Sequence, residues 1–239
     1  MSESLIVDRK EGCWTFTLNR PEKRNALSAE LIEVLIQELD SAHAQDIPLL
    51  VFQGAGKNLS AGFDFTDYEN QSEGDLVLRM VRIETLLQRI ASSPSLTVAL
   101  AQGRNFGAGV DLFAACKLRY CTPDASFRMP GLKFGLVLGT GRFLRLVGRS
   151  AALSILGNAR VFDAQEAKDI GFVQSTAAQS DWNVLLEQAA QSSSLLCPQT
   201  RKSLFGVLDD SDADRDMSEL VKSAARPGLK ERIQQYLSA

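Results

Sequence analysis

The segment Ala101–Arg119, with the sequence AQGRNFGAGVDLFAACKLR, constrains the fold of this chain more than any other stretch. The apolar run Leu96–Ala101 leads into it and is short enough to be a strand. Three glycines then permit tight or left-handed backbone, and Leu112–Cys116 follows without a polar residue. A helix that is apolar on all sides is a buried helix. The segment therefore predicts a strand, a glycine-rich turn and the first turns of a helix inside the protein.

Asp111 is the ionisable side chain in the first turn of that predicted helix. A helix N-terminus carries unpaired N–H groups and the positive end of the helix dipole, which stabilise developing negative charge, for example on a thioester oxygen. The same position also suits a plain structural role, in which Asp111 caps the helix. Its apolar neighbours would raise the pKa of Asp111 and the helix N-terminus would lower it, so the sign of the net pKa shift stays open at this stage.

Strands and helices alternate over the first two thirds of the chain, and helices alone follow. The predicted strands are 4–8, 13–19, 48–53, 96–101, 118–121, 125–129 and 172–175. The predicted helices are 28–42, 74–92, 142–147, 151–156, 164–170, 182–194, 199–208, 217–225 and 229–237, with the acidic run 209–216 as a solvated loop. The pattern predicts an α/β core with parallel strands over residues 1–175 and a helical region over residues 176–239.

Composition excludes several classes of function. The net charge of −3 and the lack of a basic stripe argue against nucleic acid as a partner. No apolar run approaches the ~20 residues of a membrane span, and the acidic start of the chain is unlike a secretory signal. The four cysteines have no CxxC spacing, and His43 is the single histidine, so no metal site is expected. A cytoplasmic location fits this cysteine usage.

Two glycine-bearing turns are the most informative pair of segments. The loop Ser60–Phe65 and the turn Gly107–Asp111 can each offer a backbone N–H to one oxygen, and two such donors make an oxyanion hole. Two nucleotide-binding alternatives are weak. Gly54–Lys57 lacks the full phosphate-loop spacing, and Gly135–Gly141 has the wrong spacing for a dinucleotide turn.

Four segments in order resemble the crotonase family, also called the enoyl-CoA hydratase/isomerase family. They are RPEKRNALS (20–28), LSAGFDF (59–65), GAGVDLFAAC (107–116) and the stretch 127–148 that joins FRMPGLKFGL to GTGRFLRLVG. A weaker fifth match is 159–173. None of these motifs is specific alone, whereas the ordered set, which spans residues 4 to about 173, is a strong signal.

The resemblance implies a spiral of repeated ββα units followed by a helical region that forms a homotrimer or a dimer of trimers. It implies that the ligand is a coenzyme A thioester, with coenzyme A carried by the substrate and no separate cofactor. The oxyanion donors that it implies are the backbone N–H groups of Phe63 and Ala108.

Further residues match family positions that bind the substrate and its coenzyme A. Lys23 and Arg24 match the path of the nucleotide and pantetheine, although two solvated charges would look the same. Asp64 matches a position beside the acyl group, although it also suits a helix cap. The full set of these positions is Lys23, Arg24, Ala26, Ala61, Gly62, Asp64, Phe65, Gly107, Pro130 and Gly131.

The departures from the family pattern concern its carboxylates. Hydratases of the family use two glutamates, which match Asp111 and Gly131 here. Dienoyl-CoA isomerases of the family have aspartate at the first position, with further carboxylates that match Gly131 and Gly139. Asp67 or Glu69 is a candidate replacement for the missing acid.

We therefore expect an acyl-CoA enzyme of the hydratase/isomerase kind that stabilises a thioester enolate, with Asp111 as its acid and base. The alternatives are a CoA-thioester-binding member without hydratase activity, and a decarboxylase or hydrolase that uses the same oxyanion hole.

Overall fold

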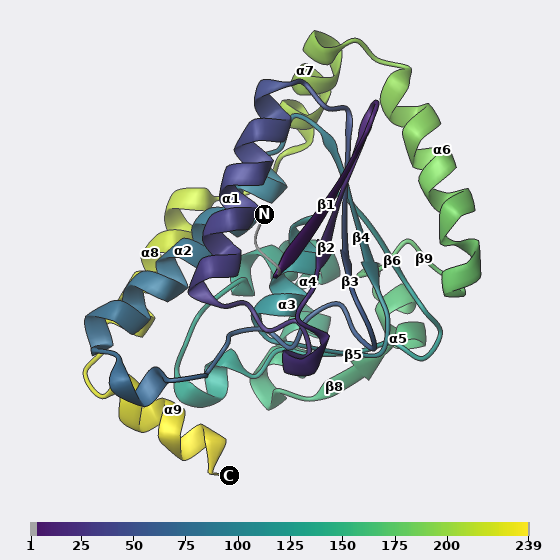
Figure 1. Ribbon diagram of the computed structural model, residues 1–239. Helices are drawn as coiled ribbons and strands as arrows, with labels where there is room; N and C mark the ends of the chain where they lie inside the picture. The colour runs from purple at the N-terminus through teal and green to yellow at the C-terminus, as the bar shows by residue number, and fades with distance from the viewer. Residues whose placement is uncertain (1–3, 239) are drawn as a thin grey trace.

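The computed structural model describes residues 4–238 and has one large, mostly parallel sheet (Figure 1). Its first two strands form an antiparallel hairpin, because Gly12 takes a φ of +74° in the turn between them. Every later pairing in this sheet is parallel. In spatial order the strands are β1 (Leu5–Lys10), β2 (Cys13–Leu18), β3 (Leu49–Gly54), β4 (Leu96–Ala101), β6 (Leu118–Cys121) and β9 (Ser175–Thr176).

Helices cover both faces of this sheet, which is why its central strand β4 is buried in every position and mostly apolar. Along β3, Leu50 and Phe52 join the core shared with the helices α1, α2 and α3. Leu49 and Val51 face the opposite way, into a smaller core closed by Trp182 of α6. Figure 1 shows the same arrangement, with α1 and α2 on one side of the strands and α6 on the other. The predicted α/β class with parallel strands is confirmed.

A second sheet of short strands was not predicted. It consists of β5 (Arg104–Phe106), β7 (Ser126–Arg128) and β8 (Val161–Asp163), with β7 in the middle. β5 and β8 have three residues each, which is too short for a hydrophobic period to show. β5 lies between the predicted glycine turn and the helix α3, and it fixes the point from which that helix begins.

The helices lie close to their predicted positions. They are α1 (Ala29–Ala44), α2 (Glu73–Ala91), α3 (Ala108–Ala115), α4 (Thr140–Asn158), α5 (Ala164–Asp169), α6 (Trp182–Ser194), α7 (Pro198–Leu208), α8 (Ala213–Ala224) and α9 (Leu229–Leu237). Short 3-10 turns are η1 (Pro21–Lys23), η2 (Tyr68–Asn70), η3 (Gly131–Phe134) and η4 (Gln179–Asp181). Ser28 caps α1 as expected, since its side chain accepts a hydrogen bond from the Leu31 N–H.

Two helices differ from their predicted form in an instructive way. The two predicted halves of α4 are continuous except at Gly148, whose φ of 76° and ψ of 167° break the helix as its sequence position suggested. The prediction of a solvated loop over the whole acidic run was wrong. Asp212 caps α8 by accepting a hydrogen bond from the Arg215 N–H, and the carboxylate of Asp216 pairs with Arg145.

The C-terminal helices α8 and α9 share the main core. Leu220, Leu229 and Ile233 are fully buried there. Figure 1 shows α9 running below α2, next to the end of the chain. None of the helices within residues 4–238 has both the length and the apolar character that crossing a membrane requires.

Candidate active site

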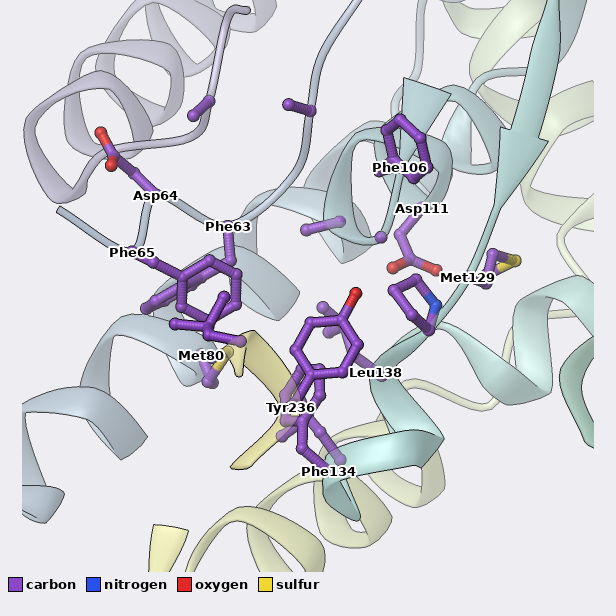
Figure 2. A pocket seen from close by; sticks show the side chains of 18 of the residues that line it. Phe63, Asp64, Phe65, Met80, Phe106, Asp111, Met129, Phe134, Leu138 and Tyr236 are labelled. Carbon is purple, nitrogen blue, oxygen red and sulfur yellow. The ribbon is translucent and has the colours of Figure 1, made fainter. Parts of the chain in front are cut away.

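A cavity of about 470 Å³ lies between the N-terminus of α3, the loop after β3, η3 and α9 (Figure 2). Most of its wall is apolar. The apolar side chains that line it include Phe63, Phe65, Met80, Phe106, Met129 and Phe134. A cavity of this size with a few converging polar groups is a typical site for a small-molecule substrate. Among the predicted site residues, all except Gly62 line it directly.

Gly62 instead joins the two glycine-bearing turns to each other. Its φ is +85°, and a Cβ at this position would lie 2.5 Å from the Phe106 carbonyl oxygen and 3.0 Å from the Ala108 nitrogen. The first distance is shorter than real Cβ contacts and the second is tighter than most of them, so glycine lets the two backbones come this close. The loop 60–65 and the turn 107–111 are therefore in direct contact.

Phe63 follows Gly62 in the chain, and the Ala108 nitrogen lies at this contact. Ala108 is the first residue of α3, so its N–H has no carbonyl within the helix. The neighbouring amides already donate hydrogen bonds. The Asp64 N–H donates to the carbonyl oxygen of Leu27, and the Gly107 N–H donates to the carbonyl oxygen of Arg128. Within residues 4–238, the N–H groups of Phe63 and Ala108 donate no hydrogen bond. Two unused donors thus stand at the wall of one cavity.

Asp111 brings a carboxylate to the same cavity from the first turn of α3. Figure 2 shows this carboxylate projecting into the cavity. Its side chain takes the space beside Gly139, where a Cβ would lie 1.7 Å from Oδ1. Oδ1 is buried and has no hydrogen-bond partner within the described residues. Burial raises the pKa of Asp111 well above its usual range, although Arg142 lowers it and Glu84 raises it further.

Asp64, by contrast, is held by neighbouring residues. Its carboxylate accepts hydrogen bonds from the Arg20 guanidinium at 2.7 Å and from the Thr66 N–H at 2.9 Å. Burial raises the pKa of Asp64, but the hydrogen bonds from Thr66 and Arg20 outweigh it and leave this pKa below its ordinary value. In Figure 2 its oxygens point away from the middle of the cavity. Asp64 therefore shapes the loop and is already paired.

Replacing Asp64 with asparagine is expected to destabilise the protein in a pH-dependent way. Hydrogen bonds to a charged group contribute about 1.5–3 kcal/mol each, so we expect a loss of about that size at pH 7. The native pKa lies below the ordinary value of 3.8, so the stabilisation is present above that pH and is lost as pH falls through the native pKa. Urea unfolding at pH 7 and near pH 3 measures both. Asp67→Asn, at an exposed carboxylate, is the control. An equal effect at both pH values would contradict this role.

The remaining predicted positions divide between the mouth and the wall of the cavity. Lys23 and Arg24 are exposed at η1 and line the mouth. The other predicted positions on the wall are Ala26, Ala61, Phe65, Gly107, Pro130 and Gly131. Asp67 and Glu69 are exposed and do not line the cavity, so the structure does not bring either of them in to replace the missing acid.

Tyr236 is a cavity residue that sequence reasoning missed. It lies on α9, more than 100 residues along the chain from Asp111, and its ring packs against Phe134 with the ring centroids 5.1 Å apart. Arg232 anchors α9 by donating to the carbonyl oxygens of Phe134 and Gly135. Figure 2 shows the Tyr236 hydroxyl projecting into the cavity that holds the Asp111 carboxylate. No motif marks this residue, since only tertiary packing brings α9 to the site.

Residues 4–238 contain no group of three or more His, Cys, Asp or Glu side chains placed to hold a metal ion. The polar groups that line the cavity include the Asp111 carboxylate with its raised pKa, the backbone of Phe63 and Ala108, and the Tyr236 hydroxyl.

Comparison with known proteins places this cavity in context. The sequence profile of the enoyl-CoA hydratase/isomerase family matches residues 8–233. A crystal structure of a provisionally named enoyl-CoA hydratase/isomerase from Bordetella parapertussis is 65% identical, covers 100% of both chains and superposes with a TM-score of 0.99. A provisionally named enoyl-CoA hydratase of Bacillus subtilis (strain 168) is 30% identical over 98% of this chain and 95% of its own length. The mitochondrial Delta(3,5)-Delta(2,4)-dienoyl-CoA isomerase of Rattus norvegicus is 33% identical over 69% of this chain and 55% of its own length.

Proposed function

Because this chain belongs to the enoyl-CoA hydratase/isomerase family, we propose that it is an acyl-CoA isomerase that shifts a carbon–carbon double bond through one carboxylate. The observation that supports this choice is that Asp111 is the single carboxylate free to act in the cavity. Of the other acids that line it, Asp64 is paired with Arg20, and Glu22 is exposed at the mouth on η1.

The proposed reaction begins with the thioester oxygen at the N–H groups of Phe63 and Ala108. The Asp111 carboxylate takes a proton from C2 of a 3-enoyl thioester, and the electron pair moves onto the thioester oxygen to form a dienolate. Two fixed N–H donors stabilise the charge as it develops on that oxygen. Asp111 then returns the same proton to C4, and the double bond ends between C2 and C3. No water and no second acid is consumed.

A raised pKa suits Asp111 for this double role. A carboxylate whose pKa lies nearer to neutral binds the proton tightly enough to remove it from carbon and releases it readily afterwards. The Asp111 carboxylate projects into the cavity, and its buried Oδ1 has no competing hydrogen-bond partner within residues 4–238. Burial, which is the main cause of the raised pKa, also keeps water away from the dienolate.

The two alternative reactions have less support from the cavity. Hydration by two carboxylates needs a side chain at position 131, which is glycine. Decarboxylation of a malonyl-type substrate needs a group that tolerates a second carboxylate. The cations that line the cavity, Lys23 and Arg24, lie at its exposed mouth, and the acyl end is walled by side chains such as Phe134 and Leu138. We therefore propose an uncharged hydrocarbon acyl chain, with Lys23 and Arg24 placed to meet the phosphates of coenzyme A.

The experiment that tests this proposal is conversion of 3-enoyl-CoA thioesters of increasing chain length to the 2-enoyl form. The change in ultraviolet absorbance on conjugation measures it. In D₂O, direct transfer of one proton by Asp111 predicts partial retention of substrate hydrogen at C4. Thermal stabilisation by acyl-CoA without turnover of any thioester would instead indicate a binding protein that has lost the chemistry.

Gly131→Glu is expected to add hydratase activity toward 2-enoyl thioesters, by at least about tenfold, since a positioned acid or base contributes ~10²–10⁴-fold. The φ of Gly131 lies outside the left-handed region, and its Cβ would meet the Leu136 carbonyl oxygen at 3.1 Å, so a small shift admits a side chain. Gly131→Gln matches the volume without the acid. Equal hydration rates in the two variants would count against the missing carboxylate as the reason for the isomerase preference.

The trimer stays a prediction. The apolar surface on α7 is consistent with it, because Val207 is 86% exposed and Leu208 66% exposed in the single chain. Such a patch is typical of an interface.

A further inference from the structure

A buried ion pair lies behind the cavity, outside its wall. Glu84 of α2 and Arg142 of α4 meet at 3.0 Å, with side chains only 1% and 6% exposed. Gln88, one turn further along α2, donates a second hydrogen bond to the same oxygen of Glu84 at 3.1 Å. Glu84 Oε2 and the Nε and Nη1 atoms of Arg142 are buried and have no partner within residues 4–238.

A contribution to the stability of the fold does not explain why this ion pair is buried. Desolvating two charges costs several kcal/mol per ion, and replacing a buried pair with apolar residues is often neutral or stabilising. Unpartnered buried atoms add to this cost, because each has lost its hydrogen bonds to water. Better-paired charges exist on the surface of the same helix, where Arg82 donates two hydrogen bonds to Glu33. The buried pair therefore calls for a role besides holding α2 to α4.

The position of the Glu84–Arg142 ion pair relative to Asp111 points to such a role. The Asp111 side chain fills the space beside Gly139, at the start of α4. Arg142 is three residues further along, in the first turn of α4, and α3 packs against both α4 and α2, the two helices that carry the ion pair. We propose that Glu84 and Arg142 are positioning residues whose opposed charges set the protonation state of the Asp111 carboxylate. This inference rests on the proposed role of Asp111 as the proton carrier.

The charges around Asp111 come from two neighbouring helices. On its own helix α3 no other side chain is ionisable. Arg142 faces it from α4 and lowers the pKa of Asp111, and Glu84 faces it from α2 and raises that pKa, after the larger effect of burial. On the cavity side the lining residues contribute the Tyr236 hydroxyl, the Asp64 carboxylate paired with Arg20 and, at the exposed mouth, Glu22, Lys23 and Arg24. The anion Glu84 partly cancels the effect of the cation Arg142 on the pKa of Asp111, so the two charges together lower this pKa less than Arg142 would alone.

The test removes each charge separately and follows the protonation of Asp111 directly. The infrared absorption of its protonated carboxyl group, assigned by its loss in Asp111→Asn, is titrated with pH in the full-length protein without substrate. In Glu84→Gln, which keeps the shape and the acceptor oxygen, the Arg142 charge is left uncompensated, and we expect the midpoint to fall by about one pH unit or more. In Arg142→Gln we expect it to rise by a similar amount. The acid limb of kcat/KM for the 3-enoyl thioester should move in the same directions.

Two controls separate charge from structure. Arg142→Lys keeps the charge and should leave the midpoint close to that of the unaltered protein. Glu33→Gln makes the matched substitution in the exposed pair with Arg82 and should not move it. If Arg142→Gln does not fold, Glu84→Gln alone decides. An unchanged midpoint in Glu84→Gln, or a shift in the same direction in both variants, would overturn the inference. Opposite shifts without isomerase turnover would uphold it and reject the proposed reaction instead.

Discussion

Asp111→Asn is expected to lower kcat/KM for a 3-enoyl thioester by about 10²–10⁴-fold, because it removes the group that carries the proton. Asparagine keeps the size of the side chain, so the cavity and the two N–H donors stay in place. Binding of an unreactive acyl-CoA should therefore change little, and calorimetric titration measures it. If Asp111→Asn turned over substrate at the rate of the unaltered enzyme, Asp111 would take no part in the reaction.

The same variant is expected to be more stable than the unaltered protein at pH 8. Burial raises the pKa of Asp111 above its ordinary value of 3.8, so the native state binds the proton more tightly than the unfolded chain. Stability then falls as pH rises from about 4 through the native pKa, since the native carboxylate has to ionise without a partner. Asparagine does not ionise. The difference in melting temperature between the two proteins should therefore widen as pH increases, which thermal unfolding at pH 5 and pH 8 measures.

Ala108→Pro is expected to lower kcat by about 10²–10³-fold, which is the typical effect of removing one oxyanion donor. A backbone N–H survives every other substitution, but proline lacks it. The first position of a helix is where proline is tolerated, because the N–H there has no helical partner. Ala108 occupies that position in α3, after a glycine whose backbone is free of the restrictions on a residue before proline.

Ala29→Pro is the matched control for this substitution. Ala29 is the first residue of α1, and Ser28 before it is extended, with a ψ of 161°. This variant should fold and turn over normally. Normal activity in a folded Ala108→Pro protein would show that this amide does not contact the reacting oxygen. The circular dichroism and melting temperature of both variants establish that they are folded.

The elements that sequence reasoning located well are those with strong local signals. The apolar stripe of α1 with Ser28 as its cap, the mostly apolar strand β4 and the glycine that breaks α4 all lie at or near the predicted positions. In each case residues that are close together in the sequence determine the element. The buried helix after the glycine turn is confirmed for the same reason, since α3 is apolar except at Asp111 and buried along its whole length.

What was missed depends on contacts between distant segments. β8 gains its place only by pairing with β7, and three residues carry no readable period. Glu84 reads as one polar residue within an amphipathic helix, and only the packing of α4 shows that it is buried against Arg142. Tyr236 reaches the cavity because Arg232 holds α9 against η3. The family motifs reach only to about residue 173, so they do not include the part of the cavity wall that α9 provides.

The overlap between the Asp111 carboxylate and the space beside Gly139 makes these two positions epistatic. An acid at position 139 would require the Asp111 side chain to leave the space beside Gly139, and it would also have to adopt a left-handed φ of 62°. A second acid at position 139 therefore depends on a prior change in the position of the Asp111 side chain. Position 131 has no such conflict, so new chemistry in this scaffold would be gained there first.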